Sequence, residues 1–333
     1  MKRNRRRSQV NQAIAVSVLL LAALFLLPLA VVTPFRSSLF GREEPVDETE
    51  PEAPPSPLPG GGLDAARPLR VLDGETVLET DLGAYLVGVV RAEMPASFES
   101  EALKAQAVAA RTYTLYKLQT GGNHGEAADV CTDHTCCQAY LDEDSARANW
   151  GENADAYEAK VEAAVRDTDG EAILYGGVPI LAVFHSSSAG LTRAAGEVWV
   201  NDLPYLQAVR SPEPGDRIPN YYSRVEFTAD ELKARLQAAF PEADLSGGME
   251  GWLKDAVTDS AGSVAALSVG GAAAKGIQVR AALGLRSACF TWEAQDGKMV
   301  FFVTGYGHGV GLSQYGASAM AAAGADYREI LTH

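Results

Sequence analysis

The sequence is short of basic residues and of cysteine. Its 333 residues include 28 Lys and Arg against 43 Asp and Glu, and only four Cys. Five of the basic residues lie within the first seven positions, which leaves 23 Lys and Arg against 43 Asp and Glu, a formal charge of −20, for the rest of the chain. Because binding to phosphates needs a basic surface, this balance argues against nucleic acid as a partner.

Charge is absent from the whole apolar run 13–32. The run is about 20 residues long, which is enough for one helix to cross a bilayer. A cleaved signal peptide is the alternative, but it would have a shorter apolar region and a better cleavage site than Pro28-Leu29-Ala30. With basic residues before it and acidic residues after it, the run predicts a membrane anchor whose basic tail, 1–12, lies in the cytoplasm.

Large apolar residues are nearly missing from EEPVDETEPEAPPSPLPGGG (43–62), which makes up most of the segment that follows, 33–66. Such a composition predicts a disordered, acidic, Pro-rich spacer. The folded part is predicted to run from 67 to 333, outside the cytoplasm. It has no internal repeat, and its mixture of hairpins and separate helices predicts one α+β domain.

Hydrophobic periodicity and turn residues predict the elements of this domain. Two hairpins are expected at Asp73-Gly74 and Gly176-Gly177. Strand-like pieces are expected within 281–302. The expected helices are 82–94, 101–119, 155–167, 230–240 and 315–331, the last one broken at Gly324.

Glu93 lies on the apolar face of the helix predicted at 82–94, because it follows Val89 by four residues and Val90 by three. Desolvation and the negative end of the helix dipole both raise the pKa of a carboxyl group at such a position. A carboxyl that is protonated near neutral pH can act as a general acid on a glycosidic oxygen. The alternative is an ion pair with Arg91 or Arg111 that holds two helices together.

The chain resembles the stage II sporulation protein D family from about Leu69 to its end. The motifs that carry the resemblance occur in the family's order: RAEMP (91–95), EALKAQAVAARTY (101–113), HSSSAGLT (185–192), DLPYLQAV (202–209) and GHGVGLSQYGA (307–317).

The resemblance implies a peptidoglycan lytic transglycosylase with Glu93 as its catalytic residue. The reaction would cleave the bond between N-acetylmuramic acid and N-acetylglucosamine, with the muramic C6 hydroxyl attacking C1 to give a 1,6-anhydro product. One carboxyl can serve as acid and then as base in this reaction. If Glu197, Asp129 or Asp133 instead activated water, the enzyme would be a muramidase.

The substrate would lie in a glycan-binding cleft formed with two loops, 185–190 and 305–316. From the residues alone, the serines of the first loop fit a simple turn equally well. The glycines of the second loop allow close approach of the backbone to a ligand, and the loop lacks the lysine of a phosphate-binding loop. With the resemblance, the predicted sugar-binding residues are His185, Ser186, Ser187, Ser188, Gly190, Glu197, His308, Gln314 and Tyr315.

Within fourteen positions the chain has two His and three of its four Cys: His124, Cys131, His134, Cys136 and Cys137. Zinc prefers such ligands, but a disulfide, a pair of reduced thiols and a chance cluster are alternatives. Some relatives in the family bind zinc near here through one His and two Cys. Because adjacent cysteines rarely bind one ion together, the predicted ligands are His124, Cys131 and Cys137, with water in the fourth position and no role required in the chemistry.

The resemblance also implies a setting: remodelling of septal peptidoglycan and engulfment of the forespore during sporulation. The expected location is the cell membrane on the mother-cell side of the septum. The expected partners are glycan strands stripped of stem peptides, a cell-wall amidase and a multispanning membrane protein. Since related proteins enhance amidases, a non-catalytic, glycan-binding enhancer is the alternative function.

Overall fold

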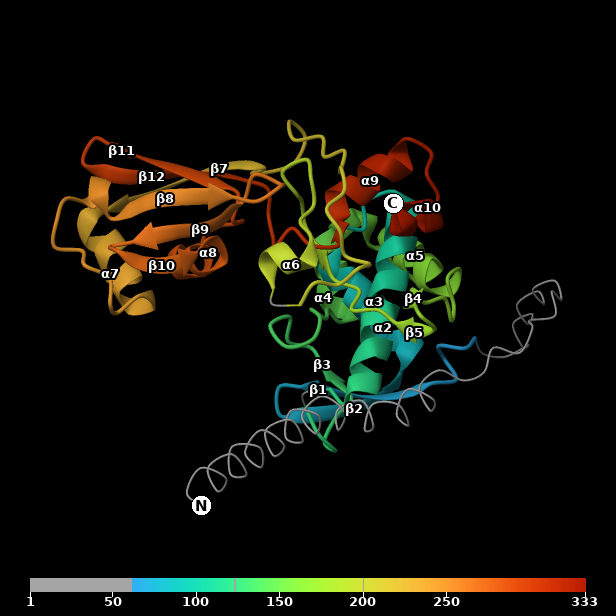
Figure 1. Cartoon of the computed structure of the whole chain (residues 1–333). Coiled ribbons are helices and arrows are strands. Elements are labelled where there is room, and N and C mark those ends of the chain that lie inside the picture. Colours follow the sequence, from blue (N-terminus) through green and yellow to red (C-terminus); the bar gives the residue numbers. More distant parts are fainter. Residues whose placement is uncertain (1–61, 123, 200) are drawn as a thin grey trace, which may run out of the picture. The chain divides into compact units, whose positions relative to one another are not determined.

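The computed structural model describes residues 62–122, 124–199 and 201–333. In these ranges helices and small sheets are mixed along the chain (Figure 1), which confirms the predicted α+β class. None of the described helices is both long and apolar enough to cross a bilayer. The predicted tail, the predicted anchor and residues 33–61 of the predicted spacer lie outside the described residues, so these assignments stay predictions.

Residues 62–66, at the end of the predicted spacer, form a turn that is tied to the folded region. The carboxylate of Asp169 accepts hydrogen bonds from the backbone N–H groups of Leu63 (2.6 Å) and Asp64 (2.9 Å). The carboxylate of Asp64 in turn accepts from Nε of Arg111 at 2.8 Å, and the Arg111 side chain is fully buried. Arg111, a candidate partner for Glu93, is therefore neutralised by Asp64 instead.

The predicted first hairpin is confirmed as β1 (Pro68–Asp73) and β2 (Thr76–Asp81). Asp73 pairs with Thr76, so the two-residue loop is Gly74-Glu75, one position later than the expected Asp73-Gly74. Gly74 has a φ of 59°, which glycine adopts without strain. The short strand β3 (Val130–Cys131) adds to β1 in parallel and brings the cysteine segment to this sheet.

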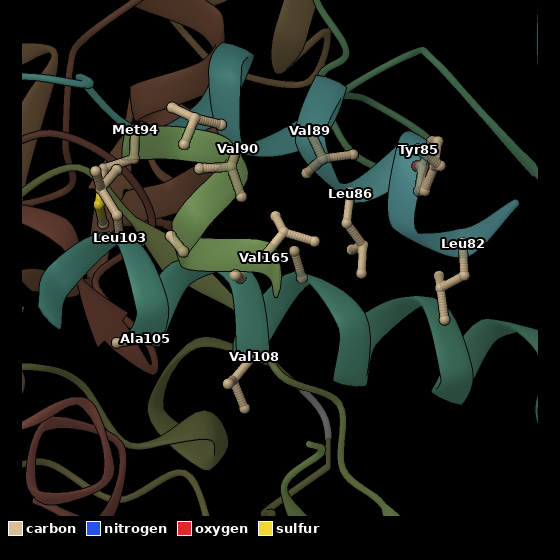
Figure 2. Close-up of a cluster of buried hydrophobic side chains, with 14 of the residues drawn as sticks. Leu82, Tyr85, Leu86, Val89, Val90, Met94, Leu103, Ala105, Val108 and Val165 are labelled. Atoms are coloured by element: carbon tan, nitrogen blue, oxygen red, sulfur yellow. The ribbon is translucent and has the colours of Figure 1, made fainter. Parts of the chain in front are cut away.

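The helix predicted at 82–94 is confirmed as α2 (Leu82–Glu93). Its side chains pack on α3 (Ser100–Thr120) and α5 (Ala154–Arg166), the other two predicted helices of this region. Figure 2 shows Leu86 and Val90 of α2 pointing toward α3, and Val165 of α5 closing the cluster. Many buried residues of α3 are alanines, so its neighbours can approach its backbone closely.

Between α3 and the second hairpin the chain also forms α4 (Glu143–Trp150). The hairpin predicted at Gly176-Gly177 is confirmed as β4 (Leu174–Tyr175) and β5 (Val178–Pro179). The chain then forms β6 (Phe184–His185) and α6 (Ala195–Val198). Strand β6 pairs in parallel with β13 (Leu312–Ser313), so the two predicted substrate loops lie next to one another.

Residues 222–304 surround a second hydrophobic cluster. One sheet has the order β11-β12-β7 and another the order β10-β9-β8 (Figure 1), and the predicted helix 230–240 is confirmed as α7. Within 281–302, residues 281–283 end a helix and only the later residues form strands. The bounds are β7 (Tyr222–Thr228), α7 (Ala229–Ala239), β8 (Leu253–Thr258), β9 (Val264–Val269), β10 (Ala272–Lys275), α8 (Gly276–Leu283), β11 (Phe290–Gln295) and β12 (Lys298–Thr304).

The chain ends in α9 (Gln314–Ala322) and α10 (Tyr327–Thr332). They confirm the prediction of a helix interrupted at Gly324, which has a φ of 101°. Ser313 caps α9 by accepting a hydrogen bond from the N–H of Gly316, and both helices pack on α3. Residues from the two ends of the described chain therefore meet around α2 and α3.

Candidate functional site

Glu93 is the last residue of α2. Asp81 caps the first turn of this helix by accepting from the N–H of Ala84 at 2.9 Å. At the other end Met94 is extended (φ −125°, ψ 136°), as expected for a residue before Pro95. The helix therefore ends at Glu93. Oε1 of Glu93 accepts a hydrogen bond from the backbone N–H of Ala139 at 2.7 Å.

The ion-pair alternative for Glu93 is wrong. Nε of Arg91 donates to Glu158 of α5 at 3.0 Å, and Arg111 pairs with Asp64. Burial raises the pKa of Glu93 above its ordinary value, although the N–H of Ala139 and the charge of a protonated His134 act in the opposite direction. The half-buried carboxyl is thus shifted toward the protonated form, because desolvation disfavours its charge and no Lys or Arg among the described residues pairs with it.

Glu93 lines a cavity of about 640 Å³. Other lining residues come from α4 and from the two predicted substrate loops: Trp150, His185, Ser186, Gln314 and Tyr315. Glu93 is the only carboxylate among the described residues of this lining. A second cavity, of about 120 Å³ beside Ala109 and Leu312, has no carboxylate among its described lining residues. The larger cavity is therefore the candidate active site.

The loop 185–190 contributes only its first residues to the cavity. His185 and Ser186 line it, whereas Ser187, Ser188 and Gly190 do not. Nδ1 of His185 donates to the carbonyl of Val310 at 3.1 Å, and burial lowers the pKa of this imidazole to about 4. His185 is thus neutral at physiological pH.

Ser188 of this loop is held by Glu213, a residue that was not predicted from the sequence. Oε1 of Glu213 accepts from the backbone N–H of Ser188 (2.9 Å), from its hydroxyl (2.6 Å) and from the hydroxyl of Ser313 (2.7 Å). One carboxylate oxygen thus joins both predicted substrate loops.

Replacing Glu213 by Ala is expected to lower the free energy of unfolding by about 1–3 kcal/mol, because three donors lose their acceptor. Denaturant unfolding followed by circular dichroism measures this effect. The exposed Glu242, replaced by Ala in the same way, serves as the control and should change stability by no more than about 0.5 kcal/mol. Equal effects of the two substitutions would show that Glu213 has no such role.

The second loop contributes Gln314 and Tyr315 to the cavity. Nε2 of Gln314 donates to the backbone carbonyl of Glu93 at 2.9 Å and to Oε1 of Gln106 at 3.2 Å. Tyr315 packs its ring edge-on against Phe98, with 4.8 Å between the centroids. Gln314 therefore positions the end of α2 that carries Glu93.

His308, the other predicted residue of this loop, does not line the cavity. Its ring lies 5.6 Å from that of His185 and 5.4 Å from that of Trp199. Burial lowers the pKa of His308 to about 3, and the neighbouring His185 acts in the same direction. His308 is thus half-buried and neutral at physiological pH, and its ring packs between those of His185 and Trp199.

The three candidates for a second carboxylate also lie outside the lining. Glu197 accepts from the backbone N–H of Ser260 at 3.2 Å and from its hydroxyl; burial raises its pKa, but these hydrogen bonds outweigh burial and the net shift is downward. Asp129 pairs with Arg70 at 3.1 Å. Asp133 caps a turn at Thr135. Glu93 is left without a carboxylate partner in the described part of this cavity.

Four possible metal ligands meet in the segment that leads to Ala139, whose N–H donates to Glu93. One ligand atom from each of His124, Cys131, Cys136 and Cys137 lies within 4.8 Å of the others. The three predicted ligands are thus together, and Cys136 joins them although the rule against adjacent cysteines had left it out. His134 is not part of the group, and its side chain is exposed. A fourth possible protein ligand thus lies where the prediction had placed water.

The separations in this cluster fit zinc. Nε2 of His124 lies 3.5 Å from Sγ of Cys136 and 3.7 Å from Sγ of Cys137, and the two sulfurs are 3.9 Å apart. With Zn–S bonds of about 2.3 Å and Zn–N bonds of about 2.0 Å, a tetrahedral site has edges of roughly 3.5–3.8 Å. No disulfide joins the described cysteines. The donor set suits a closed, structural zinc site.

Three further lining residues were not predicted from the sequence. Trp150 is the last residue of α4, and Arg286 lies in the strand-rich region 222–304, two segments without a recognised motif. Tyr306 lies in the predicted loop 305–316 but was not among its predicted sugar-binding residues. An isolated Arg or aromatic residue gives no signal in one sequence, because only the fold brings it to the cavity.

Comparisons with known proteins agree on one family. A family model described as SpoIID, Stage II sporulation protein, matches residues 73–175, which contain Glu93 and the four possible metal ligands. Stage II sporulation protein D of Bacillus subtilis (strain 168) is 33% identical over 328 residues, covering 96% of this chain and 93% of the relative.

Two further relatives are similar to this chain. The protein of the same name from Bacillus amyloliquefaciens is 33% identical over 267 residues, which cover 80% of this chain and 76% of the relative. The amidase enhancer of Bacillus subtilis (strain 168) is 30% identical over 296 residues, which cover 74% of this chain and 39% of the relative.

Proposed function

Because the chain belongs to the stage II sporulation protein D family, we propose that it is a peptidoglycan lytic transglycosylase with Glu93 as its acid and base. The observation that carries this proposal is a lone carboxyl, with a raised pKa, in a cavity of about 640 Å³. The target is the bond between N-acetylmuramic acid and N-acetylglucosamine. A general acid must hold a proton near neutral pH, which burial of Glu93 favours.

In the first step Glu93 donates its proton to the glycosidic oxygen, and the bond from that oxygen to C1 of the muramic residue breaks. The carboxylate then removes the proton of the C6 hydroxyl of the same residue, whose oxygen bonds to C1. Glu93 regains its proton, the leaving sugar has a new hydroxyl, and no water is consumed. One carboxyl suffices for this sequence, in contrast to glycosidases that use two.

A muramidase that uses water is the first alternative. It would need a group to activate the water, commonly a second carboxylate. Glu197, Asp129 and Asp133 do not line the cavity, so this alternative has less support.

A non-catalytic, glycan-binding enhancer of a cell-wall amidase is the second alternative, and the similarity to the amidase enhancer favours it. Both functions would use the same cavity, and only catalysis needs the titrating proton of Glu93.

For the cysteine cluster we propose a bound zinc ion held by His124, Cys131, Cys136 and Cys137. The metal supplies no chemistry to the reaction; it fixes the loop that ends at Ala139. Since the N–H of Ala139 donates to Glu93, that loop sets the position of the reacting carboxyl.

We also propose the setting that the sequence predicts. The chain acts outside the cytoplasm, anchored by 13–32, on septal peptidoglycan during sporulation and engulfment. An amidase that first removes stem peptides and a multispanning membrane protein are the proposed partners. Membership in a sporulation family supports this setting.

Product masses test the proposed reaction. The protein is incubated with intact and with peptide-stripped glycan strands, and the products are weighed by mass spectrometry. Transglycosylation gives 1,6-anhydro ends, whereas hydrolysis gives ends heavier by one water, about 18 Da. Binding to both strands without any cleavage would favour the enhancer and contradict the enzyme.

A further inference from the structure

Arg286 lines the same cavity as Glu93 and is paired with no carboxylate among the described residues. Its side chain makes no salt bridge and no hydrogen bond with any described residue, and Nε is buried without an acceptor. The other arginine of the lining, Arg91, is bound to Glu158. Because a guanidinium group carries five donors and keeps its charge at any physiological pH, an unpartnered Arg286 needs an acceptor from outside the chain.

The aromatic ring of Tyr306 holds this guanidinium in place. Cζ of Arg286 lies 3.9 Å from the centre of the ring, which is a close cation–π contact. Both residues are fixed through their backbones: the N–H of Gly307 donates to the carbonyl of Arg286 at 2.9 Å, and Tyr306 exchanges two hydrogen bonds with Ser187. Stacking leaves the N–H groups at the edge of the guanidinium plane available for a partner in that plane.

Such a planar set of donors matches the two oxygens of a carboxylate. In a peptidoglycan strand, the lactyl group of N-acetylmuramic acid ends in a free carboxylate or in an amide bond to a stem peptide. The free form offers a negative charge and two equivalent oxygens, whereas the amide offers one carbonyl oxygen and no charge.

We propose that Arg286, stacked on Tyr306, binds the lactyl carboxylate of N-acetylmuramic acid and thereby makes the cavity prefer strands with free lactyl groups. The identity of the sugar rests on the proposed function; the need for an acceptor rests on the unpartnered guanidinium. Arg286 is a specificity-determining residue in this proposal and takes no part in the proton transfers.

The test compares two ligands that differ only at the lactyl group, which is a charged carboxylate in one and a neutral amide in the other. Short glycan strands with free lactyl carboxylates are prepared, and part of the material is converted to neutral methylamides. Binding is measured by calorimetry with the full chain carrying Glu93→Gln, so that no strand is cut. We expect at least about 10-fold tighter binding of the free form, and a smaller difference at high salt.

Adding Arg286→Gln should remove this preference and leave the binding of the methylamide unchanged. The matched control is Arg235→Gln, because Arg235 also stacks on an aromatic ring, Phe227, but does not line the cavity. It should keep the full preference. If the glutamine variant does not fold, Arg286→Lys provides the second test, since lysine keeps the charge but cannot bind a carboxylate through a planar pair of donors.

Equal binding of the two ligands by the parent protein overturns the inference without any substitution at Arg286. The inference is also overturned if the Arg286 variant binds both ligands more weakly by the same factor, because Arg286 would then have only a structural role. Cleavage by the wild type is measured separately. If the protein prefers free lactyl groups but cuts no strand, the proposed reaction is contradicted and this inference stands. If it cuts strands but shows no such preference, this inference is contradicted and the proposed reaction stands.

Discussion

Replacing Glu93 by Gln is expected to slow the cleavage of glycan strands by at least about 100-fold while leaving strand binding unchanged. The amide keeps the shape of the side chain and can still accept the hydrogen bond from Ala139, but it cannot give or take the proton. Mass spectrometry of the products measures cleavage, and calorimetry measures binding. The exposed Glu242, replaced by Gln, is the matched control and should leave both properties intact. If the Glu93 variant cleaved strands at the wild-type rate, Glu93 would not be the general acid.

The same substitution has an expected signature in stability. Burial raises the pKa of Glu93, so its carboxyl favours the fold only while it is protonated. This contribution is complete below the ordinary pKa of glutamate, about 4.3, and is lost as the pH rises through the raised pKa of the folded state. Glutamine does not titrate. Thermal unfolding at a series of pH values should therefore show the wild type losing stability relative to the variant above about pH 4; parallel profiles would contradict a raised pKa.

Removing the proposed zinc is expected to have the largest effect on stability. A metal that binds only the folded state stabilises it by about 4 kcal/mol when its free concentration is about 1,000 times its dissociation constant. Cys137→Ser should abolish zinc in elemental analysis, lower the unfolding temperature and slow cleavage. Cleavage should slow because the loop that carries the N–H of Ala139 is no longer fixed against Glu93.

Cys289→Ser is the matched control for this experiment, because Cys289 is the one cysteine outside the cluster. It should keep one zinc per chain and the unfolding temperature of the wild type. A wild-type protein without zinc, in which alkylation finds two of the clustered cysteines oxidised, would replace the metal site by a disulfide.

The sequence was sufficient wherever one local pattern decided the structure. Helical spacing after Asp81 placed Glu93 on the apolar face of α2, which packs on α3 and α5. The hairpin at Gly176-Gly177 was found from its turn residues. The Gly270-Gly271 pair between β9 and β10 is the same signal, but the flanking residues are mostly small and few are β-branched or aromatic, so these strands were missed.

Contacts between distant segments could not be predicted. Glu213 accepts from Ser188 and Ser313, which are 25 and 100 residues away, and no periodicity relates them. Cys136 was left out by a rule of adjacency, yet the turn at Asp133 brings both neighbouring sulfurs to His124. In each case the contact depends on how loops are arranged in the folded protein, which no local sequence pattern indicates.

The hydrogen bond from Gln314 to the carbonyl of Glu93 spans 221 residues. A protein is synthesised from its N-terminus. The residues of α2 are therefore made long before Gln314, which supports the end of this helix. A chain interrupted before Gln314 would possess the glutamate without one wall of its cavity. The cavity around Glu93 is therefore completed only after the C-terminal segment has been synthesised and has folded back onto α2 and α3.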